Sequence, residues 1–228
     1  MNVKQSNMKT VSTDTNAYYT QRAQTYEEMY AKPDRQDALA MLHERVAELL
    51  EGHRALELGC GTGYWTEQII ESAESVCALD TNARMIEIAK AKRLPEEQAQ
   101  FLLADAFNVN VETDLDGDFS ACFAGFWWSH VKREEQAKHL ENLRARIGKG
   151  GVLVMIDTSF VEGVDTPIAH TDMEGNTYQI ERLPSGERYD ILKNFPTDSA
   201  LRKKIGVSVT DLRVLRLDHY WMVSGKFK

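Results

Sequence analysis

One segment carries most of the information about the fold class: Ala55-Leu-Glu-Leu-Gly59-Cys-Gly61-Thr-Gly63-Tyr-Trp-Thr66. Its start reads as the end of a short buried strand, and three glycines follow in a GxGxG pattern. Open α/β sheets bind their ligands at the carboxyl ends of such strands. Glycines there permit a tight turn and let a ligand approach the backbone N–H groups. The segment therefore predicts a first strand, a ligand-binding loop and a helix that begins near Thr62.

The chain beyond this loop alternates apolar runs of strand length with amphipathic stretches of helix length. We expect strands at 54–58, 75–79, 100–104, 119–125 and 152–157, with helices at 62–72, 82–92 and 132–147. Such alternation is typical of a parallel sheet with right-handed crossovers. Two further strands, at 209–217 and 220–227, are expected to close the chain as an antiparallel pair. The pattern therefore indicates the α/β class.

The same pattern divides the chain into an N-terminal part, residues 1–53, and a core, residues 54–228. Residues 1–12 are polar and are expected to form a loose tail. Two helices follow, and the first carries tyrosines on one face. Residues 158–196 interrupt the alternation after the fifth strand with two turns, whose flanks are expected to pair as a hairpin. We interpret this segment as an insertion on the ligand side of the sheet.

Composition and charge argue against several classes of protein. The 228 residues include 27 Lys and Arg against 35 Asp and Glu, a net charge of −8, whereas a nucleic-acid binder needs a basic face. The longest apolar run, Ala121–Trp128, is too short to span a bilayer, and the first ten residues lack the apolar stretch of a secretory signal. The three cysteines include no CxxC pair, which predicts no disulfide or zinc framework. We expect a cytoplasmic monomer or homodimer that binds neither nucleic acid nor a membrane.

Two aspartates complete the pattern, since Asp80 ends the second predicted strand in CALD and Asp105 ends the third in LLADAF. Together with ELGCGTG, they resemble the class I S-adenosylmethionine-dependent methyltransferases, in particular those that act on small molecules. The resemblance spans roughly residues 54–157, and the whole chain if the final strand pair is included. It implies a Rossmann-like, doubly wound sheet of seven strands, mostly parallel with an antiparallel last strand, and an N-terminal helical lid. It also implies S-adenosylmethionine as the cofactor and S-adenosylhomocysteine as the product.

The resemblance assigns roles to the residues of the cofactor site. Asp80 is expected to accept both ribose hydroxyls in charge-assisted hydrogen bonds, and Asp105 to accept from the adenine amine. Met85 and Phe107 would hold the adenine between them, and the lid would contribute Tyr19. The remaining residues that we expect to contact the cofactor are Glu57, Gly59, Gly61, Thr62, Gly63, Thr81, Ala106 and Phe126.

Methyl transfer from a sulfonium is an in-line displacement on carbon, so catalysis comes mostly from alignment. A general base is needed only where the acceptor must lose a proton, and His130, after the fourth strand, is the candidate. Trp127 and Trp128 offer flat faces, and the residues Tyr178, Arg182 and Lys193 of the insertion are candidate acceptor contacts. The sequence contains no convincing metal-ligand cluster. We expect a small, planar acceptor that is methylated on N, O or C.

Three other functions remain open. The protein would methylate RNA or protein if a basic groove surrounded the pocket, although its acidic charge argues against this. It would be a non-catalytic binding module if it kept the fold without turnover. A nicotinamide oxidoreductase would also place an acid after its glycines, but the dinucleotide fingerprint requires a glycine where Tyr64 stands.

Overall fold

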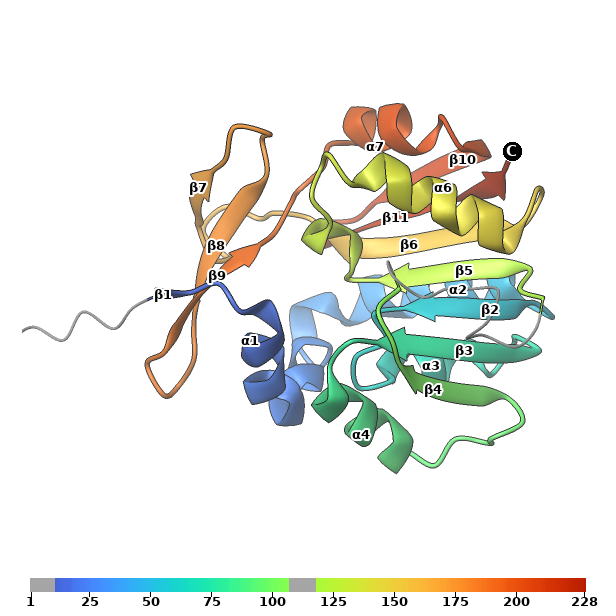
Figure 1. Cartoon of the computed structure of the whole chain (residues 1–228), viewed down its shortest axis with the longest axis horizontal. Helices are drawn as coiled ribbons and strands as arrows, with labels where there is room; N and C mark the ends of the chain where they lie inside the picture. The colour runs from blue at the N-terminus through green and yellow to red at the C-terminus, as the bar shows by residue number, and fades with distance from the viewer. Residues whose placement is uncertain (1–10, 107–117) are drawn as a thin grey trace, which may run out of the picture.

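A computed structural model describes residues 11–106 and 118–228, which form a seven-stranded and a four-stranded sheet with flanking helices (Figure 1). The N-terminal elements are β1 (Val11–Ser12), α1 (Thr15–Arg22), the 3-10 segments η1 (Ala23–Met29) and η2 (Pro33–Arg35), and α2 (Gln36–Leu50). The core then contains β2 (Arg54–Leu58), α3 (Tyr64–Ile69), β3 (Ser75–Asp80), α4 (Ala83–Ala91), β4 (Ala99–Leu103), β5 (Ala121–Gly125), η3 (Trp128–His130), α6 (Gln136–Ile147) and β6 (Val152–Thr158). The last elements are β7 (Ile168–Thr171), β8 (Thr177–Arg182), β9 (Arg188–Leu192), α7 (Asp198–Ile205), β10 (Val209–Arg216) and β11 (Tyr220–Phe227).

The seven-stranded sheet has the order β10-β11-β6-β5-β2-β3-β4. Strands β2 to β6 run parallel to one another, and β11 lies antiparallel between β6 and β10. The predicted seven-stranded, mostly parallel sheet with an antiparallel last strand is therefore confirmed. The direction of winding changes between β2 and β5, and this is where an open α/β sheet leaves a crevice for a ligand.

Helices cover both faces of this sheet because neighbouring residues of a strand point to opposite sides. On one face, Leu42 of α2 and Ile69 of α3 belong to the apolar cluster that contains Ala55. On the other, α6 and α7 cover the cluster that contains Leu56. Strand β6 is buried on both sides, which explains its nearly continuous apolar sequence. The core thus fixes the carboxyl ends of the parallel strands, where the glycine loop lies.

The segment after β6 forms most of the four-stranded sheet, whose order is β1-β9-β8-β7. Strands β8 and β9 form an antiparallel hairpin, as the turn residues predict. The expectation of a loose tail is wrong for residues 11 and 12, because β1 pairs in parallel with β9. A two-residue strand leaves no periodic signal in the sequence, but it covers the backbone groups at one edge of the small sheet.

The N-terminal helix and the small sheet lie beyond the carboxyl ends of the parallel strands (Figure 1). Helix α1 begins after Asp14, whose side chain accepts a hydrogen bond from the Ala17 N–H at 2.9 Å. The chain tightens into the 3-10 segment η1 at residue 23, instead of continuing as one α-helix. This arrangement places the tyrosine-bearing face of the N-terminal part over the end of the sheet.

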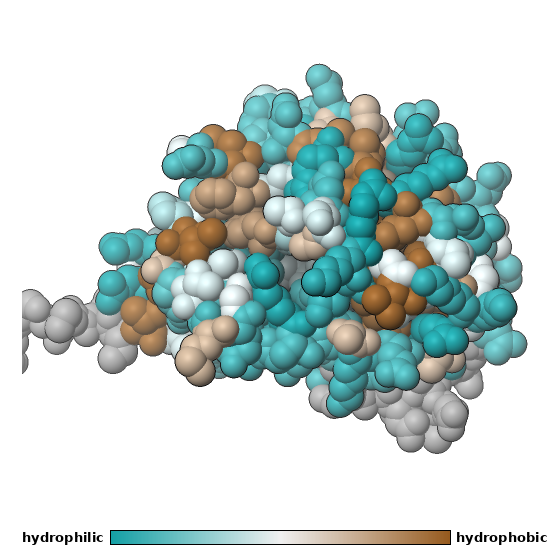
Figure 2. Space-filling model, turned by 90° about the horizontal axis from the view of Figure 1, so that it is seen from above, coloured by the Kyte–Doolittle hydropathy of each residue, from teal (hydrophilic) through white to brown (hydrophobic). Residues whose placement is uncertain are grey.

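Within residues 11–106 and 118–228, no helix is both long and apolar enough to cross a membrane. On the face shown in Figure 2, hydrophilic residues separate the hydrophobic patches from one another.

Candidate functional site

The glycine loop after β2 has a backbone that other residues adopt with difficulty. Gly59 has a φ of +63°, and a Cβ on it would lie 2.8 Å from Cδ1 of Trp127. At Gly63 a Cβ would lie 3.1 Å from both Ala89 and Phe101, so this glycine allows α3 to pack closely. The loop therefore depends on glycine for its conformation and for its contact with the following elements.

Asp80, at the end of β3, holds the loop in place. Its Oδ2 accepts from the Gly61 N–H and its Oδ1 from the Asn82 N–H, both at 2.8 Å. Burial raises the pKa of the carboxyl group, and the backbone N–H donors oppose this shift. Because each carboxylate oxygen has two lone pairs, both oxygens keep acceptor capacity toward the cavity that Asp80 lines.

A cavity of about 400 Å³ lies between the glycine loop and the segment formed by α1 and η1, which we call the lid. Its volume is in the range of ordinary small-ligand sites. The expected cofactor residues that line it are Tyr19, Gly59, Gly61, Asp80, Thr81, Met85, Asp105, Ala106 and Phe126. Met85 is buried and contributes an apolar wall, while Asp80 and Asp105 place carboxylates in the same lining. Phe107 lies outside the described residues.

Three residues expected to contact a cofactor do not line this cavity: Glu57, Thr62 and Gly63. Glu57 is buried under the loop, where it accepts a 2.6 Å hydrogen bond from the Thr66 hydroxyl. Burial raises its pKa to about 8. The Thr62 hydroxyl donates to Glu27 of η1 at 2.7 Å, and Lys92 pairs with the same carboxylate. In this structure Glu57 and Thr62 contact neighbouring side chains outside the cavity lining, where we had expected them to contact the cofactor.

Asparagine side chains join the lid to the core, and sequence reasoning missed them. Asn82 Nδ2 donates to the Thr20 hydroxyl at 2.8 Å and to the Asn16 carbonyl at 3.0 Å. Asn16 Nδ2 in turn donates to the Thr81 carbonyl at 3.2 Å. Asn82 is also the N-cap of α4, and this local role was the only signal in the sequence. Both asparagines line the cavity, so the lid forms part of its wall.

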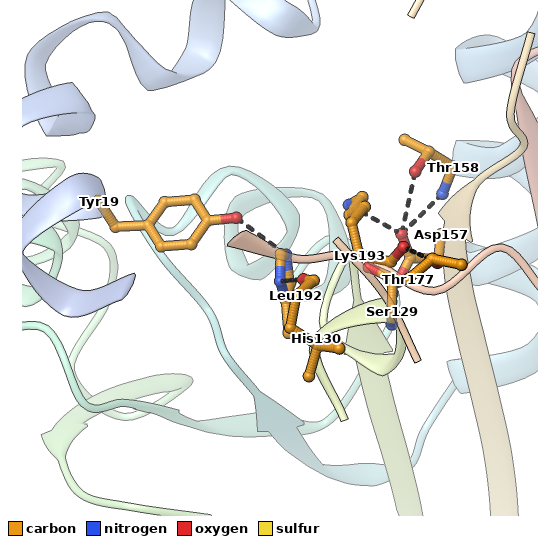
Figure 3. Close-up of polar contacts among 8 residues, drawn as sticks. All are labelled: Tyr19, Ser129, His130, Asp157, Thr158, Thr177, Leu192 and Lys193. Carbon is orange, nitrogen blue, oxygen red and sulfur yellow. Dashed lines mark hydrogen bonds and ion pairs between the residues drawn. The ribbon is translucent and has the colours of Figure 1, made fainter. Parts of the chain in front are cut away.

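His130 is held in one tautomer by contacts from two sides (Figure 3). Its Nδ1 lies 2.7 Å from the Leu192 carbonyl, which can only accept, so Nδ1 carries the proton. Nε2 is then an acceptor, and the Tyr19 hydroxyl of α1 donates to it at 2.8 Å. Burial, with Lys193 nearby, lowers the pKa of His130 to about 4, so the ring is neutral at pH 7. The structure therefore presents a neutral imidazole with its lone pair toward the lid.

A second cavity, of about 210 Å³, lies between the lid and the small sheet. It shares four residues with the first cavity: Tyr19, Tyr26, Phe126 and His130. Phe126 has a φ of +56°, a strained conformation for an aromatic residue that occurs where the two cavities meet. The two cavities thus adjoin at a wall of three aromatic rings and one imidazole.

The second cavity contains one of the expected acceptor residues, Lys193. Its ammonium group lies 3.4 Å from the buried carboxylate of Asp157, which Figure 3 shows surrounded by polar partners. That carboxylate also accepts from the backbone N–H groups of Ser129 at 2.8 Å and Thr158 at 2.7 Å. Asp157 therefore ties β6 and η3 together beneath the cavity.

The other expected acceptor residues are elsewhere. Trp127 lines the first cavity, and Trp128 is only 1% exposed because it packs in the core under α6. Tyr178 donates to Asp172 and stacks on His170, and the exposed Arg182 lies at the end of β8. The side chains of Trp128, Tyr178 and Arg182 are therefore not in the lining of the second cavity, where we expected acceptor contacts. The turn residues predicted the hairpin that holds Tyr178 and Arg182, but not the direction in which these side chains point.

Among the described residues, no group of three or more His, Cys, Asp or Glu side chains is arranged to hold a metal ion.

Comparisons with known proteins agree with this architecture. Residues 55–151 match the model of a family described as a methyltransferase domain. The chain is 30% identical to the demethylmenaquinone methyltransferase of Staphylococcus epidermidis over 112 residues, which is 48% of this chain and 44% of that protein. It is 25% identical to an uncharacterized methyltransferase of Bacillus cytotoxicus over 224 residues, 94% of this chain and 99% of that protein. It spans about half the length of the first curated relatives that it matches.

A similar fold occurs in the solved structure of the DhpI–SAH complex. The TM-score is 0.73 at 24% identity, and the match covers 92% of this chain and 93% of that one. The glycine loop, the sheet order and the match to the family model agree with one another. Residues 55–151 are therefore similar to a methyltransferase domain, and they lie in a Rossmann-like, mostly parallel sheet.

Proposed function

We propose that the chain binds S-adenosylmethionine in the larger cavity and transfers its methyl group to a small molecule in the smaller one. The observation that carries this proposal is the shared wall of Tyr19, Tyr26, Phe126 and His130 between the two cavities. A methyl donor and an acceptor need adjoining sites because the transfer is an in-line displacement with no intermediate carrier.

The lining of the larger cavity fits S-adenosylmethionine. Asp80 and Asp105 supply acceptors for the ribose hydroxyls and the adenine amine, and Met85 supplies an apolar surface for the adenine ring. The backbone around Gly59 and Gly61 leaves room for close approach of the methionine end. When bound, the cofactor supplies an electrophilic methyl group on a positively charged sulfur.

The chain's own residues have three tasks in this reaction. The lid excludes water from the shared wall, since Tyr19 and Tyr26 close it from the side of α1 and η1. The small sheet orients His130 through the Leu192 carbonyl. Where the acceptor atom carries a proton, His130 Nε2 is the base that receives a proton. The Tyr19 hydroxyl, which donates to Nε2, either moves aside first or relays the proton, giving its own to Nε2 and taking the one from the acceptor. The bond from sulfur to methyl breaks as the bond from the acceptor atom to methyl forms.

The dimensions of the smaller cavity support a small acceptor over RNA or a protein chain, because its volume of about 210 Å³ lies below the usual range of small-ligand pockets. Planarity has less support than expected, since neither Trp127 nor Trp128 lines this cavity.

The test is calorimetry with S-adenosylhomocysteine, followed by transfer of a labelled methyl group. Asp80→Ala is expected to weaken S-adenosylhomocysteine binding by about 1–3 kcal/mol, since charge-assisted hydrogen bonds are lost. Glu87→Ala, an exposed change on the neighbouring helix α4, is the matched control and should bind as the wild type does. If Asp80→Ala binds as tightly as the wild type, the assignment of the larger cavity is wrong.

A further inference from the structure

The smaller cavity has an unusual charge for a protein with a net charge of −8. Its lining contains four cationic side chains, from α1, the residue before η2, η2 itself and the residue after β9, and two carboxylates; these are Arg22, Lys32, Arg35 and Lys193, with Asp165 and Glu181. Lys32 is exposed and stands at the rim, whereas the other cations are half-buried or buried. Three cationic side chains therefore lie inside the cavity, two of them in long ion pairs, Arg35 with Asp165 and Lys193 with Asp157.

Arg35 is the most deeply buried of these cations. It is only 5% exposed, and its Nε is buried without a hydrogen-bond partner. Its ion pair with Asp165 is long, at 3.8 Å, and its guanidinium lies 5.8 Å from the centre of the Tyr220 ring. Nε is too deeply buried to meet a ligand itself, but Arg35 lines the cavity, and a guanidinium has further N–H groups beyond the one that faces Asp165. Those groups are the donors that a ligand with acceptor oxygens would meet.

Lys193 also keeps donor capacity. Its ammonium group has three hydrogen atoms to donate. Its ion pair with Asp157 is 3.4 Å long, and that carboxylate is already occupied by two backbone N–H groups. The ammonium therefore has hydrogen atoms left for a ligand. Arg22 contributes charge from the lid, where its Nη1 donates to the Tyr18 hydroxyl at 2.9 Å.

We propose that the methyl acceptor is a small organic anion, a carboxylic or a phosphonic acid, whose charged group is held by Arg35 and Lys193. The inference rests on the proposed function, and it names the substrate class of the same site. A guanidinium matches two oxygens of a carboxylate or phosphonate at once, and an ammonium adds a third contact. The charged group would anchor the acceptor in the cavity that the shared wall closes, and Glu181 and Asp165 discourage a second negative group.

The test titrates protein saturated with S-adenosylhomocysteine with three probes of similar size: lactate, methylphosphonate and the neutral lactamide. Either or both anions are expected to bind at least about tenfold more tightly than lactamide, a difference of about 1.4 kcal/mol. The two anions distinguish a carboxylate acceptor from a phosphonate one. If lactamide binds as well as both anions, or none of the three binds, the inference is overturned.

Variants locate the binding to the two cations. Lys193→Met is expected to weaken binding of the preferred anion about tenfold, and Arg35→Gln at least as much. Arg35 is buried, so Lys193→Met keeps the inference testable should the arginine variant not fold. Arg45→Met, an exposed change on α2, is the control. Unchanged anion binding in Lys193→Met, with S-adenosylhomocysteine still bound, would overturn the inference.

Failure of this inference is distinct from failure of the proposed function. S-adenosylhomocysteine that does not bind the wild type contradicts the larger-cavity assignment, whereas S-adenosylhomocysteine that binds without any preference for anions contradicts only the acceptor class. A labelled methyl group found on neutral amines, phenols or thiols, but on no acid, would likewise overturn the acceptor class alone.

Discussion

The buried carboxyl group of Glu57 makes the stability of the fold depend on pH in a direction opposite to that of most acidic residues. Its side chain lies under the glycine loop, 2% exposed, with the Thr66 hydroxyl as its hydrogen-bond partner. Burial is the main cause that raises its pKa from 4.5 to about 8, with a smaller contribution from Asp80. The folded protein therefore holds this proton at pH 7, and the unfolded chain does not.

The sign follows from proton linkage. Because the pKa is raised on folding, the stabilising effect is complete below pH 4.5 and is lost as the pH rises toward 8. Between these values one extra proton is bound by the folded state, so the free energy of unfolding falls by about 1.4 kcal/mol per pH unit. From pH 5.5 to 7.0 the contribution of Glu57 should fall by about 2 kcal/mol.

The assay is urea unfolding of the wild type and Glu57→Gln at pH 5.5 and 7.0. Glutamine keeps an oxygen to accept from Thr66 but cannot titrate, so the difference between the two proteins isolates Glu57 from every other titrating group. We expect the wild type to lose about 2 kcal/mol more than the variant over this interval. Equal pH dependence of the two proteins would show that Glu57 does not carry a buried proton and would refute the reasoning.

Two further changes test the loop and the base. Gly59→Ala places a Cβ 2.8 Å from Trp127 at a φ of +63°. We expect the free energy of unfolding, measured with urea, to fall by about 1–3 kcal/mol, and S-adenosylhomocysteine binding, measured by calorimetry, to weaken. Wild-type values in both measurements would contradict the close packing. His130 should titrate near pH 4 in an NMR titration of the wild type. Tyr19→Phe removes the donor to Nε2 and should raise that pKa, by up to about 1 unit, because the hydrogen bond favours the neutral ring. A pKa near 6.5 in the wild type would count against the buried, hydrogen-bonded imidazole.

The sheet and the glycine loop were predictable because their signals are local. An apolar strand, a GxGxG turn and an acid at the end of the next strand are each contained in a few residues, and β2, β3 and the loop all appear where these signals place them. The same is true of the hairpin of β8 and β9, whose turn residues mark it. Local signals also placed Asp80 and Asp105 in one cavity, because parallel strands end at the same edge of the sheet.

The smaller cavity was predictable only in part, since Lys193 was expected there and Arg35 was not, and its residues come from segments far apart in the chain. Arg35 reaches it from the 3-10 turn before α2, and Lys193 from the residue after β9. No spacing in the sequence relates these two positions. Trp128 was expected to contact the acceptor, but its side chain points into the core, while the neighbouring Trp127 lines the larger cavity. The direction of a side chain in a 3-10 turn depends on the packing around it, which composition and periodicity do not report.

The position of α1 couples the two cavities. Tyr19 lines both of them, Asn16 lines the larger, and Tyr18 lines the smaller, all from one helix of eight residues. The helix is anchored on one side by Asn82 and on the other by the 2.6 Å hydrogen bond from Gln21 to the Tyr189 hydroxyl. Because α1 lines both cavities, a ligand that fixes the position of α1 in one cavity also fixes part of the wall of the other. Linkage then requires that the acceptor tighten cofactor binding by the same factor by which the cofactor tightens acceptor binding.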